Sequence, residues 1–461
     1  MKAIADPDNA LGRGLAAIRA QFKVPGDFAP PVLAAAEAAA KRTPTAHADR
    51  TATRFVTLDP AGSTDLDQAF AIEAAGADLL LHYAIADVAW FVDDGGPIDT
   101  EAWTRGETIY LPGEKAPLYP PVLSQGAASL LPDGPRPAIV FTVRVAPDGG
   151  VKLEGAERAI VRSQAKLAYE TVSDADVPPG FADLAKRIQA AEDKRGATRV
   201  DPPQQEVDPV TGGGYELAFR PYTPAEQNNA ALSLATNMAI ADALQAHHTG
   251  LFRVMAEPDA GAIRRLRHTA AAFKLNWPSD QSLEVFERTL VASDPRQAAF
   301  MLAIRRAGQG ASYVPYKDGV VPWHAAMAAT YAHATAPLRR LADRYVVMAT
   351  LAIANGQPVP ATVSDSFAKL PQVMARADAL SGRVERAVVD LAETVLLRGQ
   401  VGGIFPAVVT DLDERGARMQ LTDLPVVARV DAKNVTPGDT LRVRLTAVDP
   451  VQWALHFDRV N

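Results

Sequence analysis

Three aspartates lie close together in residues 56–70, which read VTLDPAGSTDLDQAF. Asp59 ends an apolar run, Asp65 and Asp67 follow a Pro- and Gly-containing stretch, and Gln68 comes next. Carboxylates that are brought together raise one another's pKa unless a cation neutralises them. Mg²⁺ can do this with a few carboxylates, water and phosphate oxygens, and it supports phosphodiester hydrolysis. The alternative is a polar turn whose aspartates accept hydrogen bonds from backbone amides, and spacing alone favours it slightly.

A second candidate region, residues 331–345, reads YAHATAPLRRLADRY. Pro337 is expected to begin a helix, because proline suits the first helical position. The early turns of this helix would carry three arginines, Arg339, Arg340 and Arg344. Backbone amides at a helix start and guanidinium groups together would clamp a phosphate. The alternative is a solvated helix face on which Arg339 pairs with Asp343, and both interpretations stay open on local evidence.

Three single residues are weaker candidates. His324 and His333 could act as ligands, although a lone histidine is more often a hydrogen-bonded structural residue. Tyr110 lies in ETIYLPG, residues 107–113, where a strand should end in a turn. Its ring could stack on a nucleic-acid base, although half-buried packing is the more common role of such a tyrosine.

The elements that must position these residues follow from the hydrophobic pattern. Short helices are expected at 10–22 and 30–41, and strand-like stretches follow from residue 55, including 79–92 and 138–151. Longer Ala- and Leu-rich helices are expected at 224–248, 260–275, 281–307, 335–354 and 364–398. Residues 399–461 return to short strands and suit a five-stranded barrel of the OB type.

Composition narrows the function classes. The 461 residues contain no cysteine, which excludes disulfides and thiolate zinc sites and fits a reducing cytoplasm. We find neither a signal peptide nor an apolar run long enough to span a membrane. The net charge of −7 does not indicate a nucleic-acid binder, but local patches steer polyanions. Residues 251–306 hold nine Lys and Arg against six Asp and Glu.

Four segments occur in a distinctive order: TLDPAGSTDLDQAF, HYAIADVAWFVDDGGPIDTEAWTRGETIYLPG, LSQGAASLLPDGPRPAIVFTV and YAHATAPLRRLADRY. Together they resemble the ribonuclease II family of processive 3′→5′ exoribonucleases, which release nucleoside 5′-monophosphates. The resemblance implies an α+β fold with an RNB-type catalytic body of mixed sheet and helices at 51–398. A small helical segment at 1–50, of helix-turn-helix or winged-helix type, would precede it, and an RNA-binding OB barrel at 399–461 would follow.

The resemblance also implies roles for single residues. The first family motif carries four magnesium-binding aspartates, of which three match Asp59, Asp65 and Asp67. The fourth is Gln68 here, whose neutral carbonyl oxygen would remain available to Mg²⁺ or Mn²⁺. Three further residues match family positions near the reacting nucleotide. Tyr110 would stack on the terminal nucleotide, Arg339 would grip the scissile phosphate, and Glu385 would be the active-site glutamate.

The arginine-rich motif implies further RNA contacts by His333, Thr335 and Arg340. This chain also departs from the family pattern. Ala336 stands where the family usually has serine, and Ala84 stands where it usually has histidine. The helix at 226–243 lacks the family's paired glutamates and retains Asn237.

The expected partner is single-stranded RNA with a free 3′ end, bound by a monomer in the cytoplasm. Family members commonly carry two cold-shock-type barrels before the body, and residues 1–50 are too short for one. We therefore expect an open entrance and tolerance of structured RNA with a 3′ overhang. Gln68 keeps a second hypothesis open, an RNA-binding protein with this scaffold and impaired catalysis. The barrel offers four residues to RNA: Phe405, Arg415, Arg418 and Arg429.

Overall fold

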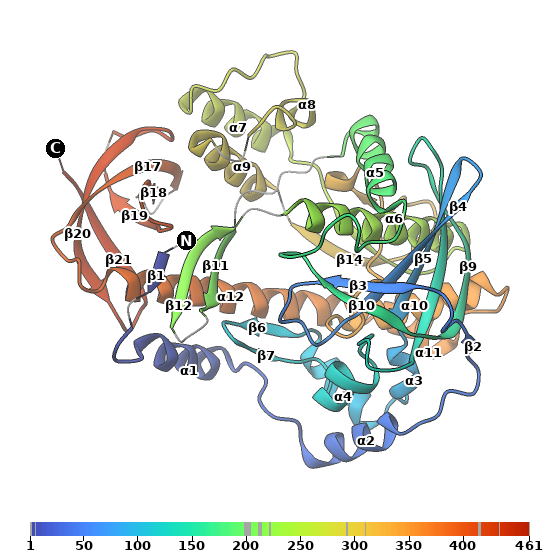
Figure 1. Ribbon diagram of the computed structural model, residues 1–461. Helices are drawn as coiled ribbons and strands as arrows, with labels where there is room; N and C mark the ends of the chain where they lie inside the picture. The colour runs from blue at the N-terminus through green and yellow to red at the C-terminus, as the bar shows by residue number, and fades with distance from the viewer. Residues whose placement is uncertain are drawn as a thin grey trace.

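The computed structural model describes residues 2–4, 6–197, 204–210, 214–220, 223–291, 294–308, 310–413, 416–432 and 434–460. These residues form a large body of mixed sheets and helices, with a closed five-stranded barrel at one end (Figure 1). The α+β class and the small C-terminal barrel expected from the sequence are confirmed.

The largest sheet has seven strands in the order β10-β3-β4-β5-β8-β9-β2. Their bounds are β2 (Ala48–Asp49), β3 (Phe55–Asp59), β4 (Gln68–Ala75), β5 (Asp78–Ala86), β8 (Arg136–Val145), β9 (Val151–Val161) and β10 (Ser163–Ala168). The two outermost pairs are parallel, and the pairs between them are antiparallel. Because β3 ends at Asp59 and β4 begins at Gln68, the acidic loop connects two neighbouring strands.

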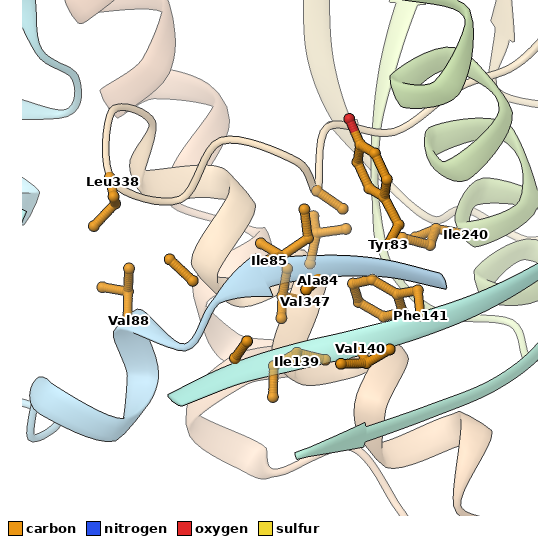
Figure 2. Close-up of a cluster of buried hydrophobic side chains, with 14 of the residues drawn as sticks. Tyr83, Ala84, Ile85, Val88, Ile139, Val140, Phe141, Ile240, Leu338 and Val347 are labelled. Atoms are coloured by element: carbon orange, nitrogen blue, oxygen red, sulfur yellow. The ribbon is translucent and has the colours of Figure 1, made fainter. Parts of the chain in front are cut away.

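Two long helices cover one face of this sheet. Helices α6 (Pro224–Ala246) and α10 (Leu341–Ala354) pack against β9, and α5 (Phe181–Arg195) packs against α6. The capping box of Thr223 and Glu226 fixes the start of α6. Figure 2 shows part of the shared core, which contains side chains of β5 and β8 and also Leu338 from the loop before α10. The core therefore holds that loop as well as the helices.

The N-terminal helices brace two different parts of the body. Helix α1 (Ala10–Phe22) packs along the long helix α12 (Leu370–Leu397), and its Leu11, Leu15 and Ile18 are buried there. Helix α2 (Pro30–Ala40) packs on α4 (Pro97–Arg105) and joins the main core. The helices expected from the sequence are confirmed, but they join separate cores, whereas a helix-turn-helix unit would share one.

Smaller sheets surround the main one. One contains β1 (Lys2–Ile4), β12 (Tyr215–Arg220) and β11 (Gln204–Pro209). Another contains β14 (Ala311–Pro315), β13 (Leu251–Met255), β15 (Trp323–His324) and β16 (Ala329–Thr330), and β6 (Ile109–Leu111) pairs with β7 (Glu114–Ala116). The remaining helical segments are α3 (Val88–Phe91), η1 (Leu123–Ala127), α7 (Ala260–Ala272), α8 (Leu283–Glu287), α9 (Pro295–Ala307), η2 (Ala325–Met327) and α11 (Ala361–Phe367). Across the described ranges, no helix is both long enough and apolar enough to cross a membrane.

The C-terminal barrel consists of β17 (Ile404–Asp413), β18 (Gly416–Leu421), β19 (Val427–Asp431), β20 (Thr440–Asp449) and β21 (Ala454–Val460). It contacts the body through α9, where Arg306 Nη1 lies 2.9 Å from Asp411 Oδ2. Phe405 packs edge-on against Phe457, so part of this ring belongs to the barrel core. Arg415 lies outside the described residues.

Some element boundaries differ from the sequence expectation. The strand expected through residue 92 ends at Ala86, because the Asp87 carboxylate accepts a hydrogen bond from Trp90 N and caps α3. The helix expected at 281–307 is two helices, since Asp294 caps a new N-terminus at α9. The helix expected at 364–398 also divides, into α11 and α12, with proline in the first turn of α12.

Candidate active site

One buried serine, Ser129, holds the loop between Asp59 and Asp67 in place. The Ser129 hydroxyl accepts a 2.8 Å hydrogen bond from Leu66 N and donates one of 2.8 Å to Thr64 O. Leu130 N also donates to Leu66 O at 2.9 Å. Ser129 is fully buried and follows the π-helical turn η1. The segment LSQGAAS thus shapes the acidic loop.

Asp67 is buried in this loop, and Asp59 is partly buried. Burial raises the pKa of Asp59 to about 7 and that of Asp67 to about 8, while the nearby Arg339 guanidinium acts in the opposite direction. Oδ2 of Asp59 is buried and has no hydrogen-bond partner among the described residues. A buried carboxylate oxygen without a partner is costly unless a cation or a proton satisfies it. The pair therefore fits a hard divalent cation with oxygen ligands.

The arginine-rich segment reaches this pair directly. Leu338 N donates a 2.7 Å hydrogen bond to Asp67 Oδ1, and Arg339 Nε lies 3.4 Å from Asp67 Oδ2. The Leu338 side chain is buried in the core of Figure 2, which holds its amide in place. Arg339 remains about half exposed, at 47% of its side chain. Its guanidinium can therefore meet a ligand from solvent.

Asp65 is engaged by the β6–β7 hairpin. Lys115 Nζ lies 2.6 Å from Asp65 Oδ1, and the Tyr110 hydroxyl donates to Asp65 Oδ2 at 3.4 Å. Tyr110 is 51% exposed, so its ring is free to stack on a base. The other half of this residue is covered, so stacking on a base stays a prediction beside half-buried packing.

Gln68 has a neutral hydrogen-bond partner, unlike Asp65 and Asp67, which lie against cations. Its Oε1 accepts a 2.7 Å hydrogen bond from the Tyr83 hydroxyl. This hydrogen bond ties the oxygen to β5, and the role of metal ligand that the sequence suggested stays a prediction. Over the ranges that are described, no group of three or more acidic or histidine side chains forms a metal-binding cluster. Lys115 and Arg339 lie against Asp65 and Asp67 instead.

The start of α10 differs from the expectation and changes the role of Arg340. The helix begins at Leu341, because the backbone of Arg340 is extended and forms an isolated antiparallel β-bridge with Glu107. The Arg340 guanidinium donates to Asp343 at 2.9 and 2.8 Å, and Asp343 Oδ2 also accepts from Ala336 N at 2.8 Å. Arg340 therefore stabilises the loop from Ala336 to Leu341. The expected pair of Arg339 with Asp343 is replaced by the pair of Arg340 with Asp343.

Arg344 is not part of a phosphate clamp. It is 2% exposed, and its guanidinium is held by Asp99 and by the Tyr345 hydroxyl. The helix expected to start at Pro337 would have placed Arg344 one turn after Arg340. In the structure it points into the core between α10 and α4.

His333 and Thr335 also support the loop from inside. His333 Nδ1 lies 2.7 Å from the Tyr313 hydroxyl, and burial, assisted by Arg340, holds its pKa well below the ordinary value. The imidazole is therefore neutral and offers no charge to a phosphate. Thr335 is buried, with its hydroxyl 2.9 Å from Ser233 Oγ and 3.3 Å from Asn237 Nδ2. Burial also lowers the pKa of His324 to about 4, so this imidazole too is uncharged at neutral pH.

Glu385 lines a cavity beside Tyr110. This cavity of about 450 Å³ lies between the YLPG turn, α12 and β11. Larger cavities of about 570 and 800 Å³ lie away from the acidic loop, near Trp323 and near His82 respectively. The chemistry of Asp59 and Asp67 therefore identifies the site better than cavity size does.

Sequence reasoning missed several residues around the acids. Lys115 follows the YLPG motif and meets Asp65 only because of the hairpin turn. Lys166 Nζ donates to Ala61 O at 2.8 Å, and the Tyr169 hydroxyl accepts from Asn229 Nδ2 at 2.8 Å. Lys166 and Tyr169 both lie in the segment SQAKLAYE, at 163–170, and this segment could have indicated them.

Comparison with known proteins places these features in a family. Residues 48–355 match the RNB domain model, and residues 404–460 match the RNase II-type exonuclease C-terminal S1 domain. Ribonuclease R of Escherichia coli (strain K12) is 26% identical over 407 residues, which are 80% of this chain and 49% of that protein. Ribonuclease R of Mycoplasma pneumoniae is 26% identical over 462 residues, 88% of this chain and 62% of that protein. The chain spans about half the length of the first two curated relatives.

Solved structures give the same result for the fold. Mycoplasma genitalium RNase R in complex with ribose methylated single-stranded RNA superposes with a TM-score of 0.85 at 20% identity, covering 98% of this chain and 78% of that one. Yeast Ssd1, a pseudonuclease, superposes with a TM-score of 0.69 at 16% identity, covering 98% and 58%. The resemblance to the ribonuclease II family is confirmed, and this chain belongs to the RNB domain family.

Proposed function

We propose that this chain hydrolyses RNA from its 3′ end and releases nucleoside 5′-monophosphates processively. Membership of the RNB family and the exoribonuclease names of its relatives support this proposal. The observation that carries it is the placement of Asp59 and Asp67, two poorly solvated carboxylates, near Arg339. A structural turn would not need two poorly solvated acids beside a half-exposed arginine.

Asp59 and Asp67, with Asp65 beside them, would hold Mg²⁺, or Mn²⁺ as an alternative. When bound, such an ion supplies a nucleophilic hydroxide and stabilises charge on the phosphate. The unpartnered Oδ2 of Asp59 fits this role. Leu338 N keeps Asp67 oriented through its 2.7 Å hydrogen bond, so that the other carboxylate oxygen faces Arg339.

Arg339 and Tyr110 would hold the terminal nucleotide. Arg339 has a planar guanidinium that can bind two phosphate oxygens at once, and its exposure leaves it accessible. Tyr110, whose hydroxyl contacts Asp65, offers a half-exposed ring on which a base can stack. Glu385 lines the cavity on which Tyr110 also borders and would contact the same nucleotide. His333, Thr335 and Arg340, first assigned to RNA, would instead shape the loop that carries Arg339.

The substrate would be single-stranded RNA with a free 3′ end, bound by a monomer in the cytoplasm. Similar solved structures include RNase R with single-stranded RNA and with double-stranded RNA, which supports tolerance of structured RNA with a 3′ overhang. The barrel would add affinity through contacts to the phosphate backbone of the RNA, and this part of the affinity would fall as the salt concentration rises.

A second candidate function is RNA binding with impaired catalysis. Gln68 removes a charge from the family's four-aspartate motif, and its amide oxygen is engaged by Tyr83. Ssd1, which shares the fold, is described as a pseudonuclease.

A 5′-labelled single-stranded RNA, incubated with Mg²⁺ and with EDTA, separates the two candidates. A ladder that shortens from the 3′ end with Mg²⁺, and intact RNA with EDTA, is the result expected from an exoribonuclease. Tight binding with intact RNA under both conditions would favour the inert binder.

A further inference from the structure

The β6–β7 hairpin presents a tyrosine and a lysine side by side. Tyr110 and Lys115 are directly opposite each other in its antiparallel register, joined through Pro112 and Gly113. Gly113 has a φ of +76°, which the tight turn requires. Opposite residues of an antiparallel pair project from the same face. The aromatic ring proposed to hold the base and an ammonium group therefore leave the hairpin together.

Both side chains meet at Asp65. Lys115 Nζ is 2.6 Å from Oδ1 of this carboxylate and 3.5 Å from Thr64 Oγ1. The Lys115 and Asp65 side chains are only 18% and 10% exposed. This ion pair is therefore largely screened from water, unlike the weak pairs of a protein surface.

The charges around the acidic loop are divided unequally. Asp65 has Lys115, and Asp67 has Arg339 together with Leu338 N. Asp59 keeps a buried oxygen without a partner in the described part of the chain. Lys166, the other nearby cation, donates to the backbone carbonyl of Ala61. Asp65 thus has the shorter of the two cation contacts, 2.6 Å to Lys115, against 3.4 Å between Asp67 and the half-exposed Arg339.

The far end of β6 is anchored to the arginine-rich loop. Thr108 N donates to Arg339 O at 2.9 Å, and Leu341 N donates to Gly106 O at 2.9 Å. The hairpin is therefore held at its base by the backbone that carries Arg339 and near its tip by Lys115. Without the contacts at Asp65, the hairpin that carries Tyr110 would be held only at its base.

We propose that Lys115 is a positioning residue: its ion pair makes Asp65 an anchor for Tyr110, leaving Asp59 and Asp67 as the main cation ligands. This inference rests on the proposed function for the identity of the site. Lys115 would therefore lower the affinity for the cation and improve the alignment of the substrate. The Lys115 charge repels a divalent cation, yet it fixes the ring against which the last base would stack.

Two measurements without turnover test this assignment. The first is Mn²⁺ binding to the RNA-free protein, followed by electron paramagnetic resonance. A unit positive charge within roughly 5 Å of a divalent ion weakens its binding by about tenfold even at the dielectric constant of water, so removing a neighbouring cation should strengthen binding on that order. Lys115→Met should therefore bind Mn²⁺ about tenfold more tightly than the wild type, and Lys115→Arg should match the wild type.

The second measurement is the fluorescence of RNA with 2-aminopurine at its 3′ end, bound in EDTA. Stacking on Tyr110 quenches this base in the wild type, and Lys115→Met should relieve the quenching while Lys115→Arg retains it. Glu114→Gln is the matched control, because Glu114 lies next to Lys115 and pairs instead with Arg19 at 3.1 Å. Lys115→Gln serves as a second variant should Lys115→Met not fold.

Unchanged Mn²⁺ affinity together with unchanged quenching in the folded variants would overturn the proposal. Weaker Mn²⁺ binding in Lys115→Met would also overturn it, because Lys115 would then support the ligands of the ion. Failure of the proposed function is distinguishable, since it would appear as a wild-type protein that binds RNA and leaves it intact with Mg²⁺. The two measurements here do not depend on cleavage.

Discussion

Leu338 N donates a 2.7 Å hydrogen bond to Asp67 Oδ1, although 271 residues separate the two along the chain. This contact joins the acidic loop to the segment that carries Arg339. Leu338 is buried in the main core, and Asp67 lies between the core and the exposed guanidinium. The position of Asp67 is therefore a property of the folded body, and changes in packing around Leu338 should affect the site.

Ser129→Ala should loosen the acidic loop. The substitution removes the acceptor of Leu66 N, in a buried hydrogen bond, and the donor to Thr64 O, in a partly buried one. An unsatisfied buried group costs about 1–3 kcal/mol, and the free energy of unfolding should fall by that amount. Thermal or urea unfolding measures the change. Ser364→Ala, on the exposed side of α11, is the control and should change little; equal stability of both variants would mean that Ser129 does not hold the loop.

Glu393→Gln should change how stability depends on pH. Glu393 Oε1 accepts from Gln205 Nε2 at 2.6 Å and from Val427 N at 2.7 Å, and burial raises its pKa to about 8. Folding therefore retains a proton that the unfolded chain releases above its ordinary pKa. Stability from this group is complete below that ordinary pKa and is lost as pH rises toward 8.

A neutral amide at position 393 can accept the same two hydrogen bonds and does not titrate. The variant should equal the wild type near pH 4.5 and become relatively more stable at higher pH, by at most about 1.4 kcal/mol per pH unit up to pH 8. Urea unfolding at several pH values measures this difference. A constant difference across the range would show that folding does not raise the pKa of Glu393.

Gln68→Asp should lower the Mg²⁺ concentration that gives half-maximal cleavage, or leave it level. The substitution adds a negative charge near the other acids, and a carboxylate attracts a divalent cation more strongly than an amide does. It also shortens the side chain that accepts from the Tyr83 hydroxyl, so a matched Tyr83→Phe variant measures the effect of losing that hydrogen bond. A clear rise in the Mg²⁺ requirement beyond that of Tyr83→Phe would contradict a metal near Gln68.

The order of motifs in the sequence identified residues that the structure brings together. Asp59, Asp65, Asp67, Tyr110 and Arg339 do meet, and the barrel follows from its short alternating strands. The start of α10 could not be predicted from the neighbouring residues, because a backbone β-bridge to the distant Glu107 keeps Arg340 extended. The same long-range pairing decides that Arg340 supports the loop.

The environments of other side chains were also set by distant segments. His333 and Thr335 lie in a motif with charged neighbours, yet Tyr313 and Ser233 bury them from other elements. Lys115 carries no motif of its own and reaches Asp65 through the register of a two-stranded hairpin. Residue type and spacing indicate such roles only when the partner lies in the same segment.

Asp67→Asn tests the central assignment most directly. The amide keeps the shape of the side chain and its hydrogen bond from Leu338 N, but it removes the charge. If Asp67 holds the cation, single-turnover cleavage of bound RNA with Mg²⁺ should fall by roughly 10²–10⁴-fold, since each ~1.4 kcal/mol of barrier is a factor of ten. RNA affinity in EDTA should change little, and Asp133→Asn, an exposed aspartate paired with Arg136, should cleave normally. Cleavage by Asp67→Asn at the wild-type rate would mean that the acidic loop is a structural turn.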